Sequence, residues 1–411
     1  MRTPTFLLLL LIFVYTAPAT ELRVGKNRTY KTISAALNAA NTGDHVIVDN
    51  GIYREGNLII NKTLTITGVG FPVIDGEKKV EIITVTAPSV TVEGFKVIAS
   101  GYASLQDPGA IKVRNTHHAL ITRNILDDNV FGIYIQYGAH CTVKENTITA
   151  YGTDEQMSGN GIHCWKSEHL LISGNNITGH RDGIYFEFVT HSVITHNLSQ
   201  KNVRYGLHFM FSHDDEYYRN IFRNNGAGVA VMFTNRVKMF NNIFEENWGD
   251  AAYGLMLKEI SDSHISGNIF VRNTSAIHME GTNRILVEKN RFESNGWGMK
   301  IQASCMDNEI RQNNFRGNTF DISTNGSLVL NTFNGNYWDK YEGYDLNKDR
   351  IGDIPYRPLS LFSVIVENNP PAMLLFRSFM VTLLDKSEKI LPSLTPDNFI
   401  DNAPLMQPLV L

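Results

Sequence analysis

The sequence predicts an all-β fold, a parallel β-helix built from coils of about 22 residues. The first observation is a repeated motif, Asn-x-(Ile/Leu/Phe), which begins at Asn124, Asn146, Asn175, Asn220, Asn242, Asn268, Asn290, Asn313 and Asn331, with a weaker copy at Asn197. The second is a glycine before alternating apolar residues, at Gly132, Gly161, Gly183, Gly206, Gly228, Gly254 and Gly298, with Ala276 in the same series. Most neighbours in each series are 22 or 23 residues apart. At about 3.3 Å per strand residue, such a repeat makes a loop of roughly 70 Å, enough for one three-sided coil.

The two series suggest how the coils stack. Identical amides on successive coils can hydrogen-bond to one another at a bend, which explains the asparagines. Glycine supplies backbone freedom at a second bend. The residues one and three positions after each glycine are apolar and should point into the core, because side chains alternate along a strand.

The N-terminus reads as a secretory signal peptide over residues 1–19. Its apolar run, residues 6–15, is too short to span a bilayer, and Ala17 and Ala19 form an A-x-A pattern. The 37 basic and 41 acidic residues include no basic run, so nucleic acid is excluded as a partner. The three cysteines, Cys141, Cys164 and Cys305, are expected to be apolar fillers of the core.

The β-helix is expected to occupy residues 20–336. A short helix over 33–40, with Thr32 as its N-cap, should cover the open N-terminal end, because an uncapped solenoid exposes its core and strand edges.

One outward sheet of the predicted β-helix is unusual in composition. The positions two and four after each glycine should face solvent, and they carry histidine, methionine and aromatic residues where surface sheets usually carry threonine, lysine and glutamate. The candidate soft-metal or docking residues are His163, His208, Met210, Met232, Met256 and His278. Trp165, Tyr185 and Trp248, the last from an insertion beside this sheet, are predicted to contact a partner.

Two kinds of chemistry fit this outward sheet. Thioether and imidazole groups suit Cu(I), and Met210 and Met232 should lie on adjacent coils. Alternatively, these side chains cover a protein interface, where methionine is adaptable. His117, His118 and His169 fall in expected turns and are interpreted as ordinary surface residues.

Residues 337–411 are predicted to form a C-terminal cap and a docking arm. Asp345, Asn347, Asp349 and Asp353 have a calcium-loop-like spacing, but Arg350 stands where glycine is expected. A turn held by Asp and Asn side chains is the alternative.

A helix is expected from about residue 372 to 389. Its apolar stripe is Leu374, Leu375, Phe379, Leu383 and Leu384. The stripe and the proline-rich, apolar tail after it favour an arm that docks on another protein over one that folds back on the solenoid.

The coil repeat, the segment NYWDKYEGYDLNKDRIGDIPYRP and the ending with SLTPDNF and APLM resemble the NosD family of periplasmic maturation proteins for nitrous oxide reductase. The resemblance implies a right-handed β-helix on the outer face of the inner membrane. Its partners would be an ABC transporter permease with its ATPase, a small copper chaperone and nitrous oxide reductase, and only the permease would give it membrane contact. It also implies a non-enzymatic part in building the copper–sulfur centre of the reductase, with copper as a transient ligand.

The residues themselves also leave open a second class of function, that of a carbohydrate-active enzyme. The opening TYKTISAALNAANTGDHVIVDNGIY is typical of carbohydrate-active β-helices, such as uronate polysaccharide lyases and epimerases. Such chemistry needs a base and cations around one sugar ring. The candidates for those roles, Arg181, Asp182, Glu187, His208 and Lys300, are scattered over about six coils at roughly 4.8 Å each.

Overall fold

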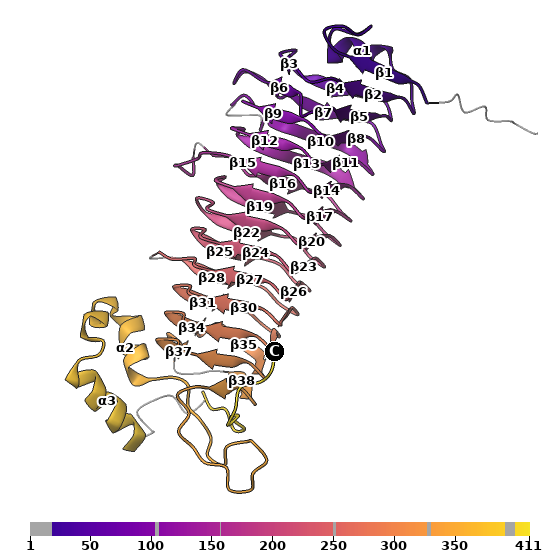
Figure 1. Ribbon diagram of the computed structural model, residues 1–411. Coiled ribbons are helices and arrows are strands. Elements are labelled where there is room, and N and C mark those ends of the chain that lie inside the picture. Colours follow the sequence, from indigo (N-terminus) through magenta and orange to yellow (C-terminus); the bar gives the residue numbers. More distant parts are fainter. Residues whose placement is uncertain (1–18, 103–106, 157, 250–251, 327–329, 391–398) are drawn as a thin grey trace, which may run out of the picture.

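The computed structural model describes residues 19–102, 107–156, 158–249, 252–326, 330–390 and 399–411. The predicted signal peptide, apart from Ala19, lies outside the described residues. The chain forms a parallel β-solenoid of about 13 turns, which Figure 1 shows as a long stack of rungs. Three parallel sheets form its sides, so the predicted fold class is confirmed.

We call the three sheets A, B and C. Along the chain, each turn contributes a strand to sheet C, then one to sheet A and then one to sheet B. Sheet A consists of β1 (Glu21–Val24), β2 (His45–Val48), β5 (Thr65–Gly68), β8 (Thr91–Glu93), β11 (Leu120–Thr122), β14 (Thr142–Lys144), β17 (Leu171–Ser173), β20 (Val193–Thr195), β23 (Glu216–Tyr218), β26 (Lys238–Phe240), β29 (His264–Ser266), β32 (Leu286–Glu288), β35 (Met306–Arg311) and β38 (Leu330–Asn334). Sheet B consists of β3 (Ile52–Tyr53), β6 (Val73–Asp75), β9 (Lys96–Ile98), β12 (Ile125–Asp127), β15 (Thr147–Thr149), β18 (Asn176–Thr178), β21 (Leu198–Gln200), β24 (Ile221–Arg223), β27 (Ile243–Glu245), β30 (Ile269–Val271), β33 (Arg291–Glu293), β36 (Asn314–Arg316) and β39 (Tyr337–Trp338). Sheet C consists of β4 (Leu58–Ile60), β7 (Ile83–Val85), β10 (Gly109–His117), β13 (Phe131–Ala139), β16 (Ile162–Trp165), β19 (Asp182–Glu187), β22 (Tyr205–Met210), β25 (Ala227–Met232), β28 (Tyr253–Lys258), β31 (Ser275–Glu280), β34 (Trp297–Ile301) and β37 (Phe320–Ser323).

A buried amide ladder runs along the bend between sheets A and B. Each asparagine donates from Nδ2 to Oδ1 of the asparagine on the next coil, over 2.9–3.1 Å from Asn124 to Asn336. The backbone N–H of each asparagine donates to the same Oδ1 atom, as in Asn197 N to Asn220 Oδ1 at 2.9 Å. The predicted stacking is therefore confirmed, and Asn197 is a full member rather than a weak copy.

The sequence interpretation of Asn331 was wrong. Asn336 follows Asn313 in the ladder, and Asn331 instead accepts from Asn308 in a separate column. The sequence analysis also missed a second amide ladder. Its members, five residues after those of the first, are Asn202, Asn225, Asn247, Asn273, Asn295 and Asn318.

The reason why glycine is required at the positions of the glycine series differs from the one expected. None of the members of this series has a positive φ. The coils approach so closely here that a Cβ on Gly132 would lie 2.4 Å from the carbonyl oxygen of Gly161, and one on Gly228 would lie 2.4 Å from that of Gly254. Glycine is needed for close approach rather than for backbone freedom.

The core contains the apolar residues that follow the glycines and asparagines, as predicted. Ile133, Ile162, Phe186 and Leu207 have no exposed surface. Phenylalanines from sheet B stack from coil to coil, with centroid distances of 4.5 Å for Phe244 to Phe270 and 4.2 Å for the last pair, Phe315 and Trp338. All three cysteines are buried, which fits their predicted role as fillers.

The N-terminal helix closes the open end of the solenoid. Helix α1 (Ile33–Ala39) begins after Thr32, whose hydroxyl accepts from Ala35 N at 3.2 Å, as predicted. The Glu55 carboxylate accepts from the next two backbone amides, Ile33 N at 2.7 Å and Ser34 N at 2.8 Å. Figure 1 shows α1 over the first coils.

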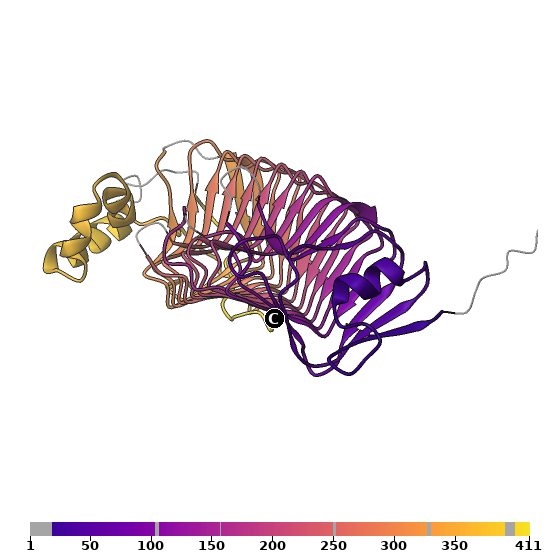
Figure 2. The ribbon, with the colours of Figure 1, turned by 90° about the horizontal axis from the view of Figure 1, so that it is seen from above.

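The single C-terminal helix expected over 372–389 is wrong. The segment forms α2 (Leu361–Asn368), a 3-10 helix η1 (Pro370–Leu375) and α3 (Phe379–Ile390). The two prolines of η1 cannot donate hydrogen bonds within a continuing helix, and Arg377 has a φ of 64°, which separates η1 from α3. Figure 2 shows these helices beside the last coils. No helix among the described residues is long and apolar enough to cross a membrane.

Part of the tail folds back and completes the solenoid. Phe399 is buried in the core, and Asp401 and Leu405 form parallel bridges to Phe333 and Tyr337. The Asp401 carboxylate ends the amide ladder. Its Oδ2 accepts from Asn336 N at 2.9 Å, Asn336 Nδ2 at 3.0 Å and Trp338 Nε1 at 3.1 Å, and its Oδ1 accepts from Gly335 N.

We expect Asp401→Asn to lower the free energy of unfolding by about 2–4 kcal/mol, because an amide NH2 would face buried donors that need an acceptor. Urea unfolding followed by circular dichroism measures the change. Asn402→Ala, at the exposed neighbouring position, is the matched control and should unfold at the wild-type midpoint. Equal midpoints for Asp401→Asn and the wild type would contradict the assigned capping role.

Candidate docking face

Sheet C presents the predicted histidines and methionines on its outward side. The strand register places Tyr134, His163, Tyr185 and His208 on successive coils, followed by Ala230, Met256, His278 and Lys300. A second column holds Gln136, Trp165, Glu187, Met210, Met232 and Lys258. The alternation read from the sequence therefore placed these side chains on the correct face.

His163 lies inside a stack of rings and is only 7% exposed. Its ring centroid is 4.5 Å from that of Tyr134 and 4.9 Å from that of Tyr185. Burial lowers the pKa of His163 from 6.5 to about 3, and the nearby Arg181 guanidinium adds to this effect. His163 is therefore neutral near pH 7.

His208 belongs to a buried ionic group. Its Nδ1 lies 3.3 Å from Arg204 Nη2 and 3.6 Å from Asp182 Oδ2. Arg204 binds the fully buried Asp182 with two hydrogen bonds, from Nε at 3.0 Å and Nη2 at 2.7 Å. Burial alone would raise the pKa of Asp182, but the contacts with His208 and Arg204 outweigh it and lower the pKa. Asp182 therefore stays ionised.

The six candidate metal ligands lie as two neighbouring pairs and two separate histidines. Met210 pairs with Met232, and Met256 pairs with His278, in adjacent strands. Tyr185 separates His163 from His208. Within the described ranges, no three His, Cys, Asp or Glu side chains are grouped so that they could hold one metal ion. Of the six, only the two pairs place thioether or imidazole groups, which are ligands that suit copper, next to each other in adjacent strands.

An apolar strip follows sheet C at its corner with sheet A, and the sequence analysis missed its exposed phenylalanines. We call the strip the aromatic edge and define it as Tyr137, Trp165, Phe188, Met210, Phe211, Met232 and Phe233. Phe188, Phe211 and Phe233 stack at 5.3 and 5.1 Å between centroids and are 43%, 37% and 36% exposed. The Trp165 ring packs edge-on against Tyr137 at 4.9 Å. The signal in the sequence was an aromatic residue five positions after three consecutive column glycines.

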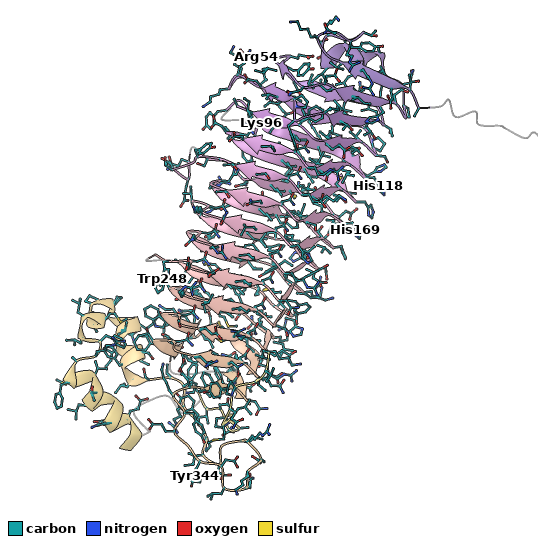
Figure 3. The ribbon with its side chains drawn as sticks, in the orientation of Figure 1. Arg54, Lys96, His118, His169, Trp248 and Tyr344 are labelled. Carbon is teal, nitrogen blue, oxygen red and sulfur yellow. The ribbon has the colours of Figure 1, made fainter. Side chains whose placement is uncertain are left out.

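Trp248 lies away from the aromatic edge. It is 57% exposed, in the turn between sheets B and C, and Figure 3 shows it on the side of the solenoid opposite His118 and His169. Tyr185 is half-buried within the ring stack of sheet C. Trp165 and Tyr185 thus lie on sheet C itself and Trp248 lies in the turn before it, as the sequence analysis placed them.

The C-terminal arm is fixed to the solenoid by one helix and exposes another. Phe362 and Val366 of α2 are buried near Phe320 of β37, and Glu367 pairs with Lys300 at 2.9 Å. Beyond α2, a set of apolar side chains remains exposed, which we call the arm surface. It comprises Leu374 (90% exposed), Leu375 (52%), Phe379 (82%), Met380 (58%) and Leu383 (47%). Leu384 is half-buried.

The loop with calcium-like spacing is held by its own hydrogen bonds. Asp345 accepts from the backbone amides of Lys348 at 2.6 Å and Arg350 at 2.8 Å, and Asp353 accepts from Leu346 N at 2.6 Å. Asn347 Nδ2 donates to Asp349 Oδ2 at 3.0 Å. These contacts match the alternative in which Asp and Asn side chains hold a turn.

Comparison with known proteins finds one family and two relatives that match most of the chain. The family described as "Periplasmic copper-binding protein (NosD)" matches residues 149–343. A "Probable ABC transporter binding protein NosD" from Pseudomonas aeruginosa is 28% identical over 371 residues, covering 86% of each chain. Its counterpart from Stutzerimonas stutzeri is 26% identical over 373 residues, covering 86% of this chain and 85% of the relative. This chain is similar to NosD proteins over most of its length.

The NosD match contains all six candidate metal ligands and most of the aromatic edge, whereas the arm lies beyond it. Among solved structures, the catalytic unit of an α-1,3-glucanase from Streptomyces thermodiastaticus has a TM-score of 0.61 at 14% identity, covering 74% of this chain and 65% of that one. At that identity the likeness shows the β-solenoid fold of this chain and nothing about its activity.

The low pKa of His163 predicts a pH-dependent stability. The unfolded chain takes up a proton below pH 6.5, whereas the folded chain does so only near pH 3. The contribution of His163 is therefore fully present above pH 6.5 and is lost as the pH falls, by about 1.4 kcal/mol per pH unit. His163→Phe keeps the ring stack and should make the dependence shallower by about that amount. Urea midpoints across this range measure it.

Tyr185→Phe is the control for this experiment, since it keeps the ring stack and leaves the imidazole of His163 in place. It should retain the wild-type slope. An unchanged slope in His163→Phe would show that this imidazole is not kept neutral by burial.

Proposed function

We propose that this chain is a periplasmic accessory protein of an ABC transporter and assists assembly of the copper–sulfur centre of nitrous oxide reductase. In this role it is a docking platform and not a catalyst. The observation that carries the proposal is a rigid solenoid with two separate exposed apolar surfaces, the aromatic edge and the arm surface. Exposed apolar patches of this kind mark interaction sites. Similarity to a family described as periplasmic and copper-binding supports the proposed location and metal.

The arm surface is proposed to bind the transporter permease, whose ATPase would supply the ATP hydrolysis. The curated relatives are named as ABC transporter binding proteins. Packing of α2 on sheet C holds η1 and α3 in place, so little conformational entropy is lost when a partner binds. Contact with the membrane would then come through the permease alone.

The aromatic edge is proposed to receive the copper chaperone or the reductase. Aromatic side chains dominate the binding energy of many interfaces, and methionine adapts to partners of different shape. Met210 and Met232 of this edge form one pair of candidate copper ligands, and Met256 with His278 on sheet C forms the other.

The state of the ionisable groups supports a non-catalytic role. A lyase or epimerase needs a base and a cation that can reach the sugar. Asp182 is fully buried and paired with Arg204, and Lys300 is paired with Glu367 of α2. These side chains already satisfy one another.

We expect Leu374→Gln, Phe379→Gln and Leu383→Gln together to abolish copurification with the permease. Glutamine preserves helix propensity while removing the apolar surface. The matched control is Leu346→Gln with Val410→Gln, two exposed apolar positions away from the arm. The arm variant should keep the wild-type melting temperature, since none of its three side chains is buried. Permease binding that survives the triple substitution would rule out this docking surface.

We expect Phe188→Asn, Phe211→Asn and Phe233→Asn together to weaken binding of the chaperone or the reductase by roughly thirtyfold or more. All three residues have φ near +50°, where asparagine is tolerated, so the fold should be retained. Phe71→Asn is a close control, because Phe71 is 46% exposed with a φ of 54° on another part of the solenoid. Surface plasmon resonance measures the affinities. Wild-type binding by the triple variant, or an equal loss with Phe71→Asn, would exclude the aromatic edge as the docking surface.

A further inference from the structure

Four exposed histidines stack along the corner between sheets C and A. We call His118, His140, His169 and His191 the histidine ladder. Successive ring centroids are 5.2, 4.7 and 5.3 Å apart, and the rings of His140 and His169 are parallel. Figure 3 shows His118 and His169 on the same side of the solenoid. The sequence interpretation of His118 and His169 as ordinary surface residues did not anticipate this arrangement.

The fold does not need imidazoles at these positions. Each residue has φ between 52° and 58°, a region that asparagine and glycine adopt more readily than histidine does. The stabilising contact is made by the backbone, as in His118 N to Ala139 O at 3.0 Å and His169 N to Thr190 O at 3.1 Å. Asparagine at these positions would make the same backbone contacts.

On the later coils, the same column carries charged residues instead of histidines. Asp214 and Arg236 form a two-point ion pair at 2.6 and 2.8 Å, and Asp262 and Arg284 form another at 2.6 and 2.9 Å. Alternating charges stabilise neighbouring coils at this corner. Four like imidazoles cannot do so when protonated, because like charges directly opposite each other repel. The ladder therefore departs from the pattern that stability favours.

Two imidazole nitrogens at the N-terminal end of the ladder are within hydrogen-bond distance of each other. His117 Nδ1 lies 2.7 Å from His118 Nδ1, and His140 stacks on His118. Two imidazole nitrogens bound to one ion at about 2.0 Å and a right angle are about 2.8 Å apart. Farther along, the rings of neighbouring coils are close enough for exposed side chains to turn toward an ion between them. Each such ion would take two imidazoles, with water completing its coordination.

We propose that the histidine ladder, with His117, is a binding site for late first-row transition ions, copper above all. Imidazole suits copper and zinc, and the usual order of affinities places Cu(II) above Zn(II). The assignment to copper as cargo rests on the proposed function, whereas the site itself rests on the geometry of the ladder. Tyr137 and Phe188 of the aromatic edge lie three residues before His140 and His191, so bound ions would be held beside a partner docked on that edge.

The test is titration of the purified mature chain with Cu(II) sulfate and, separately, with Zn(II) sulfate. Calorimetry gives the affinity, and electron paramagnetic resonance detects nitrogen ligands to Cu(II). The test variant carries His118→Asn, His140→Asn, His169→Asn and His191→Asn. The matched control is His196→Asn, an exposed histidine with a φ of 56° at another bend.

We expect the Cu(II) affinity of the ladder variant to fall by at least about tenfold, with its melting temperature unchanged. The nitrogen coupling should be lost from its Cu(II) electron paramagnetic resonance spectrum. The control should bind as the wild type does. The double variant His140→Asn with His169→Asn should show an intermediate loss, which keeps the test valid if four changes disturb the fold. Wild-type Cu(II) binding by the folded variants, or an equal loss in the control, would overturn the site.

Permease copurification by the same variants separates this inference from the proposed function. The ladder variants should retain permease binding, since the arm surface is untouched. If Cu(II) binding is unaffected by the ladder substitutions while the arm variant loses permease binding, the ladder proposal fails and the docking proposal stands. The reverse result would leave the metal site and remove the permease contact.

Discussion

The buried amide ladder is the constraint on which the structure depends. Each asparagine of the series from Asn124 to Asn336 binds the next through its side chain and also satisfies a backbone amide. A buried amide that slipped by one residue would leave unpaired donors and acceptors, and such a defect costs more than the bond contributes. The ladder therefore sets the register of the coils from Asn124 to Asn336, and all three sheets share that register there.

A common register turns residues that are about 22 positions apart into neighbours. Inside the solenoid the side chains of each column must pack against one another, as the Phe244 and Phe270 rings do. The residue types of the inward columns are therefore explained by the stability of the core. Outside, a column has no such requirement. Where an outward column still repeats one side chain, as the phenylalanines of the aromatic edge and the rings of the histidine ladder do, ring stacking adds a little stability but core packing does not require the residue. Those columns are where binding chemistry is to be sought.

The C-terminal tail divides into a structural part and an exposed part. Phe399 and Asp401 complete the last coil, and Asp401 gives the amide ladder an acceptor at its open end. Between that return and the solenoid, α2 anchors a short helical segment that keeps Leu374 and Phe379 in solvent. The tail thus contains both a segment that folds back as a cap and a helical segment with exposed apolar side chains, which the sequence had left as alternatives.

The amino-acid sequence by itself determined the solenoid, its repeat length, the inward columns and the face that carries His163, Met210 and Met232, because these follow from periodicity and from the alternation of strand side chains. Asn331 was misplaced because a motif match cannot show which ladder an asparagine joins. Only the tertiary structure decided which outward side chains are covered. His208 is buried by Arg204 and Asp182, and Lys300 is paired with a helix 67 residues later in the chain. The stacking of His118 with His140 and the exposure of Phe379 likewise depend on how turns and tail are placed, which local sequence patterns do not encode.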